Sequence, residues 1–162
     1  MNTGIWSEPP RHVLGVPVAV QRFVARGEHA VVVVRSVEAY PTGCLVDVLV
    51  LARRGSLPSE VWARVVRDLA PLPPDRLPPR TDLRFGIEAG EGYRGRAFET
   101  AGSSGSSDDS YDSEQRLWLS PLPPGPFAFT VEWPGLGLER TALELDGAAL
   151  ARAAEGSEPY WP

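Results

Sequence analysis

The densest group of side chains that could do chemistry is acidic and lies between residues 108 and 114. Asp108, Asp109, Asp112 and Glu114 place four carboxylates close together, and carboxylate oxygens are ligands that Ca²⁺ prefers. The segment lacks the central glycine and the final ligand spacing of an EF-hand loop. It belongs to a Gly/Ser-rich acidic stretch, 101–115, which predicts a flexible surface loop. We therefore favour a solvated loop, and the sequence leaves open whether these carboxylates bind a cation.

The chain offers little for nucleophilic, zinc or nucleotide chemistry. It has two histidines, His12 and His29, and a single cysteine, Cys44, whereas a structural zinc site takes four such ligands. The sequence contains no GxSxG, HExxH or P-loop motif and no GxGxxG fingerprint. We therefore predict that the protein is not an enzyme, has no catalytic residues, and needs neither a cofactor nor a metal.

Aromatic side chains are the remaining candidates for contact with a partner or a ligand. Trp118 is out of phase with the leucines on either side of it, so it is the better candidate for an exposed side chain. The alternative is a sandwich strand that is buried on both faces at an oligomer interface. Trp133 shares the phase of the large apolar residues around it and is predicted to lie in the core. Tyr93 and the pair Tyr160 and Trp161 near the end of the chain complete the set of possible contact residues. Exposed rings of this kind can stack on sugars or anchor a partner.

Period-two alternation predicts the elements that position these residues. The run FAFTVEW, residues 127–133, alternates large apolar residues with small or polar ones, as in a strand with one buried face. We expect this strand to form a hairpin-like unit with a short strand at 117–119, across the proline-rich turn at 120–126. Residues 116–134 are therefore predicted to be the centre of the core.

The rest of the chain alternates short apolar runs with proline- or glycine-rich turns. Further strands are predicted at 16–26, 30–37, 44–52, 82–89, 93–100 and 140–145. The β-branched run that begins at Ala30 predicts a strand that is buried on both faces or lies at the centre of a sheet. Two helices are predicted, one within 56–69 and one at 147–155, the second capped by Asp146.

About seven or eight short strands and one or two short helices predict a single domain over residues 1–162. An antiparallel β-sandwich is the expected fold, and a small β-barrel is the alternative. The expected organisation also includes an irregular lead-in at 1–13 and a stiff proline-rich connector at 70–80.

Charge and composition restrict the partners that the chain can have. The net charge is −5, and residues 101–162 carry three arginines against ten acidic residues. Contact with a nucleic-acid backbone requires clustered cations, so we expect no nucleic-acid partner. The sequence shows no signal-peptide pattern and no apolar run of the ~18–20 residues that span a membrane. It therefore predicts a soluble cytoplasmic protein without a membrane partner.

Two stretches carry a resemblance to a family. The run LWLSPLPPGP at 117–126 is followed by Phe129, the EWP of 132–134, Thr141 and the ELD of 144–146. Together these residues resemble the C-terminal signature of uncharacterised proteins from high-GC actinobacteria. The stretch VEAYPTG at 37–43 is similar to the N-terminal part of the same group. The resemblance implies a cytoplasmic actinobacterial protein and brings no activity, cofactor or site residue with it.

The absence of a catalytic motif, together with the number of large aromatics, favours a binding function. We expect a non-enzymatic protein–protein interaction or assembly module, whose partner is another protein or a second copy of the chain in a homo-oligomer. The alternative is a β-sandwich that binds a small molecule or a carbohydrate through exposed aromatic residues.

Overall fold

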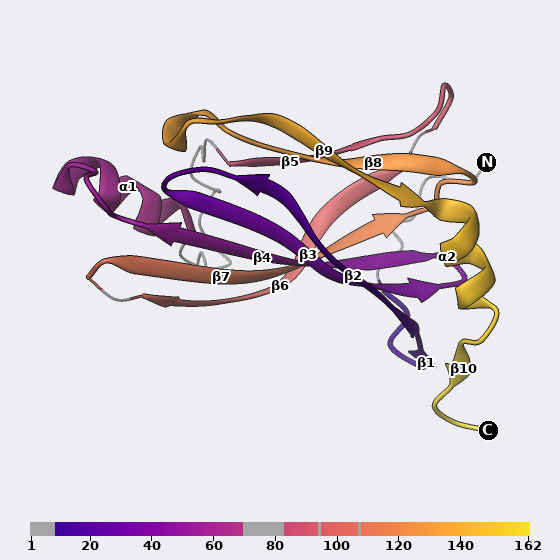
Figure 1. Cartoon of the computed structure of the whole chain (residues 1–162). Helices are drawn as coiled ribbons and strands as arrows, with labels where there is room; N and C mark the ends of the chain where they lie inside the picture. Colours follow the sequence, from indigo (N-terminus) through magenta and orange to yellow (C-terminus); the bar gives the residue numbers. More distant parts are fainter. Residues whose placement is uncertain (1–8, 70–82, 94, 107) are drawn as a thin grey trace, which may run out of the picture.

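The computed structural model describes residues 9–69, 83–93, 95–106 and 108–162. Its strands form two antiparallel sheets stacked face to face, with a short two-stranded ribbon beside them (Figure 1). The larger sheet has the strand order β2-β3-β4-β7-β6 and the smaller sheet the order β5-β8-β9. The predicted β-sandwich is confirmed, and the described strands form open sheets rather than a closed barrel.

Most strands of the larger sheet are longer than the sequence suggests. This sheet consists of β2 (Val16–Arg26), β3 (Ala30–Tyr40), β4 (Gly43–Arg53), β6 (Arg96–Ser106) and β7 (Ser110–Ser120). The smaller sheet consists of β5 (Arg84–Glu88), β8 (Pro126–Trp133) and β9 (Leu138–Asp146), with a single 3-10 turn, Pro134–Leu136, between the last two. The ribbon pairs β1 (Val13–Leu14) with β10 (Glu158–Pro159).

The main core fills the space between the two sheets. The larger sheet contributes alternate side chains such as Val32 and Val48, which are fully buried, and Trp133 of β8 meets them from the smaller sheet in the predicted phase. The other phase of β3, Val31 and Val33, is only partly buried. Of the two predicted alternatives for this strand, burial on both faces does not hold, because the smaller sheet covers only one face of the larger one. The other alternative agrees with the structure, since β3 is an inner strand of its sheet, between β2 and β4.

Residues 116–134 contribute to the core as expected, but they do not form a hairpin. Residues 117–119 lie near the end of β7 in the larger sheet, whereas 127–133 belong to β8 in the smaller sheet. The proline-rich turn between them passes from one sheet to the other, a separation of about 10 Å in face-to-face packing. A segment of this length is too long for a two-residue hairpin turn and suits such a crossing.

Strands β6 and β7 occupy most of the stretch predicted as a flexible acidic loop at 101–115. The two strands pair from residues 96 to 106 and from 111 to 120. In β7, Tyr111 and Ser113 are buried while the residues on either side of them are exposed. The loop prediction is wrong for these residues because a polar composition concealed a period-two alternation.

The two α-helices of the described residues lie at opposite ends of the sandwich (Figure 1). Helix α1 (Ser59–Leu69) follows β4, and its Trp62 and Val65 join the main core. Helix α2 (Gly147–Ala154) begins after Asp146, whose carboxylate accepts hydrogen bonds from the backbone N–H groups of the second and third helical residues. This is the cap that the sequence predicts. The predicted connector at 70–80 and residues 1–8 of the predicted lead-in lie outside the described residues.

Candidate functional site

The expectation that Trp118 is exposed is wrong, because its side chain has no exposed surface. Its phase is as predicted: Trp118 points away from the main core, on the outer face of the larger sheet. That face has a small cluster of its own, in which Trp118 packs with Tyr40 and Leu45, and Val13 packs against them. The Trp118 and Tyr40 rings meet edge to face with their centroids 5.7 Å apart. Trp118 therefore has no surface available for a partner.

The other three aromatic candidates are dispersed. The Tyr93 hydroxyl donates a hydrogen bond to the Pro121 carbonyl, and its ring packs against the main core. Burial, with a smaller contribution from Cys44, raises the pKa of Tyr93 to about 12. Tyr160 and Trp161 remain exposed, at 54% and 73%, beyond the ribbon strand β10. The structure thus does not assemble the four predicted residues into one exposed aromatic site.

A different surface stands out, at the opposite end of the same outer face. Two rows of cross-strand neighbours run over it from β2 to β7. The first row is Arg26, Val31, Leu51 and Asp112, and the second is Phe23, Val33, Leu49 and Glu114. We call these eight residues the open face. Each row has two apolar residues in the middle and a carboxylate at the β7 end.

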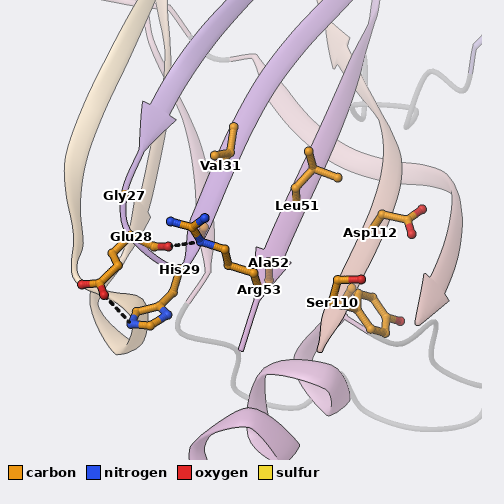
Figure 2. Close-up of a pocket in the computed structure, with 11 residues that line it drawn as sticks. Gly27, Glu28, His29, Val31, Leu51, Ala52, Arg53, Ser110 and Asp112 are labelled. Carbon is orange, nitrogen blue, oxygen red and sulfur yellow. Dashed lines mark hydrogen bonds and ion pairs between the residues drawn. The ribbon is translucent and has the colours of Figure 1, made fainter. Parts of the chain in front are cut away.

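The apolar residues of the open face keep much of their surface in solvent. Phe23 is 50% exposed and Leu51 41%, and Val31, Val33 and Leu49 are only partly buried. Figure 2 shows Val31, Leu51 and Asp112 on neighbouring strands at one end of this surface. Uncovered apolar side chains on adjacent strands form a continuous patch, and such patches commonly mark an interaction site.

Charged groups hold the edges of the open face in place. The Arg26 guanidinium lies 3.6 Å from the centroid of the Phe23 ring, within the range of a cation–π contact. On the other side, Arg35 donates hydrogen bonds to Glu114 at 2.9 Å and to Asp47 at 3.0 Å. Both hydrogen bonds raise the pKa of Arg35, and the bond to Asp47 makes the larger contribution. The Glu114 carboxylate is therefore anchored from within its own sheet.

A hollow of about 420 Å³ lies at the end of the open face, between the β2–β3 turn and the beginning of β7 (Figure 2). Arg53 closes one side of it by donating from its Nε atom to the Glu28 carbonyl at 2.6 Å. The His29 imidazole lies 4.0 Å from the Glu28 carboxylate, and its Nδ1 atom is buried without a hydrogen-bond partner. The lining combines apolar surface with both signs of charge, so it suits binding better than catalysis.

The acidic group at 108–114 does not converge on one point. Asp108 and Asp109 are exposed in the turn between β6 and β7, whereas Asp112 and Glu114 point outward from β7. Within the part of the chain that the structure describes, no three His, Cys, Asp or Glu side chains come together as metal ligands would.

Sequence reasoning missed the open face, although the sequence contains a signal for it. In β4 the charged residues Asp47 and Arg53 have the same phase as Leu49 and Leu51, so these leucines share the solvent-facing side of the strand. The continuous apolar run hid this phase.

Comparisons with known proteins found no matching family model, no matching curated protein and no matching solved structure. The resemblance to actinobacterial proteins therefore stays a prediction. Among the described helices, none is both long and apolar enough to cross a membrane.

Proposed function

We propose that the protein is a non-enzymatic interaction module that binds another protein chain through the open face. The observation that supports this most is the exposure of Phe23 and Leu51 beside three partly buried apolar residues on adjacent strands. Protein interfaces combine an apolar centre with a polar rim. The open face has this arrangement, with Arg26 on one side and two carboxylates on the other.

The charges favour a protein over a nucleic acid as the partner. Asp112 and Glu114 lie on the open face itself, and the whole chain carries a net charge of −5. Both features repel a phosphate backbone. A cytoplasmic location is part of the proposal. The one cysteine, Cys44, is a free and buried thiol, which suits a reducing compartment.

The test is capture of a partner by the immobilised protein from the cytoplasm of its source, with two matched variants. Leu51→Arg places a charge in the middle of the open face. Leu14→Arg makes the same change at a residue that is 50% exposed but lies on the ribbon. A foreign partner should be captured in stoichiometric amount by the wild type and by Leu14→Arg, and lost with Leu51→Arg. A partner that is a second copy of the chain should instead appear as self-association of the concentrated protein, with the same dependence on the two variants. Equal behaviour of both variants, or a wild type that captures no protein and also stays monomeric when concentrated, contradicts the proposal.

The hollow supports a second candidate function, the binding of a small molecule. Its volume of about 420 Å³ lies within the ~300–1,000 Å³ that is usual for ligand pockets. Val31 and Leu51 offer apolar surface, and Arg53 and Asp112 offer one charge of each sign. This site fits a small amphipathic molecule better than the exposed aromatics fit a carbohydrate. A thermal-shift screen of such molecules checks it, because a true ligand raises Tm for the wild type and not for Arg53→Gln.

A further inference from the structure

We infer that the partner of the open face is a second copy of this chain, related by a twofold axis that runs parallel to the strands. This inference rests on the proposed function and names its partner. Self-association through one patch requires the patch to be complementary to itself after the rotation. The open face meets this condition for one orientation of the axis and fails it for the other.

Consider an axis parallel to the strands that passes between β3 and β4. The rotation exchanges the two sides of the sheet and keeps each row at the same height along the strands. The first row reads Arg26, Val31, Leu51 and Asp112 in one copy, so it faces the same row read in reverse. Arg26 then faces Asp112 of the second copy, and Val31 faces Leu51. Every dimer contains these contacts twice.

The second row gives the same result. Val33 faces Leu49 of the second copy, and Phe23 comes to the side that holds Glu114. The Phe23 ring carries the Arg26 guanidinium on its face. The basic and aromatic side of one copy therefore covers the acidic side of the other.

An axis perpendicular to the strands gives the opposite result. That rotation places β2 over β2 and β7 over β7. The rotation also exchanges the two rows, so Asp112 of one copy faces Glu114 of the other, twice in each dimer. Contact between like charges destabilises a complex, and Arg26 lies on the other side of the face, where it cannot neutralise these carboxylates. The distribution of charge across the open face thus selects the parallel axis.

Pairing of two copies through the edge strand β2 is less favourable. The register of β2 shifts between Ala19 and Arg22 and again between Phe23 and Ala25. Gln21 has a φ of 52°, in the left-handed region, which interrupts the extended backbone. Bulges of this kind protect an edge from pairing with another chain. A face-to-face contact therefore fits the structure better than an extended sheet formed through β2.

The size of the open face predicts a weak dimer. Four strands at about 4.8 Å spacing and about four residues at ~3.4 Å rise, the length of the two rows, give roughly 260 Å² per copy. Stable interfaces bury about 800 Å² per partner. The parallel axis also places the same end of each open face opposite itself. The two hollows therefore face each other, and water remains in this part of the contact. We expect a dissociation constant in the range of about 10 μM to 1 mM.

Sedimentation velocity of the full chain over that concentration range tests the orientation of the twofold axis. The variants exchange the charges of Arg26 and Asp112. Arg26→Glu and Asp112→Arg each place like charges opposite one another and should weaken association about tenfold. The double variant R26E/D112R restores opposite charges, and so does an equimolar mixture of the two single variants. Within one chain the two residues lie three strand spacings apart, about 14 Å, so rescue must come from contact between copies. Far-UV circular dichroism controls for folding.

Restored association in the double variant and in the mixture supports the parallel axis. A dimer that neither single variant weakens, or that exchange fails to restore, overturns it. A chain that stays monomeric at 1 mM overturns self-association as such. In that case the capture experiment still decides the proposed function, because a foreign protein lost with Leu51→Arg keeps the open face as an interaction site.

Discussion

Replacing Trp118 by alanine tests the placement of the aromatic residue that the sequence singled out. In the structure its side chain is completely buried on the outer face of the larger sheet, against Tyr40 and Leu45. If that placement is right, the substitution removes the centre of the small cluster and leaves a cavity. If Trp118 were instead exposed, the same substitution would cost little stability.

The expected size follows from the area that a tryptophan buries. Aromatic side chains bury ~150–250 Å², and at ~25 cal/mol per Å² this corresponds to about 4–6 kcal/mol. Measured Trp→Ala substitutions in cores cost about 3–5 kcal/mol. We therefore expect Trp118→Ala to lower the free energy of unfolding by about 4 kcal/mol. Trp161, which is 73% exposed, is the matched control, and Trp161→Ala should change it by no more than ~0.5 kcal/mol.

Urea unfolding followed by far-UV circular dichroism measures both values. Trp118→Phe is a useful third variant, because it keeps an aromatic ring opposite Tyr40 and should lose clearly less stability than the alanine variant. Similar losses for Trp118→Ala and Trp161→Ala would refute the buried placement. So would a loss below ~1 kcal/mol for Trp118→Ala.

Two further predictions concern Cys44 and Gly147. Burial raises the pKa of the Cys44 thiol from 9.0 to about 12, so its contribution to stability is complete below pH ~9 and is lost as the pH rises towards 12. At pH 10 this loss is about 1.4 kcal/mol. Between pH 8 and pH 10, the free energy of unfolding should therefore fall by about 1.4 kcal/mol more for the wild type than for Cys44→Ala. An equal fall for the two proteins would contradict the prediction. A Cβ atom on Gly147 would lie 2.0 Å from the Pro123 carbonyl oxygen and 2.7 Å from that of Gly125. Gly147→Ala should therefore cost about 1–3 kcal/mol despite its better helix propensity, whereas Gly125→Ala, with open space around the new Cβ, should be nearly neutral in thermal unfolding.

The sequence was sufficient to predict the fold class because alternation and turns are local properties. The run at 127–133 predicts one buried face, and in β8 Phe127, Phe129, Val131 and Trp133 are all buried. The cap at Asp146 was likewise predictable from its position before an alanine-rich run. Which sheet each strand joins was not predictable, because pairing depends on contacts between residues far apart in the chain.

The candidate site was not predictable for a related reason. Period-two patterns show which residues share a face, but they do not show what covers that face. Trp118 has the predicted phase and is nevertheless buried, because Tyr40, Leu45 and Val13 surround it. Val33 lies in an unbroken run of valines and is nevertheless partly exposed, because no such cluster forms at its end of the sheet.

The outward positions of β4 make the case that the open face has a partner. Leu45 is apolar and buried, because Trp118 and its neighbours cover it. Asp47 follows, and its charge is matched by Arg35. Leu51 lies further along the same side of the same strand and is 41% exposed. The outer side of β4 thus carries an apolar residue at the position that the Trp118 cluster covers and a charged residue at the next position. It carries an apolar residue again at Leu51, which the described part of the chain leaves exposed. Leu49 and Leu51 lie between two outward charges, Asp47 and Arg53. Apolar residues at these two positions support the proposal that a second chain covers this part of the face.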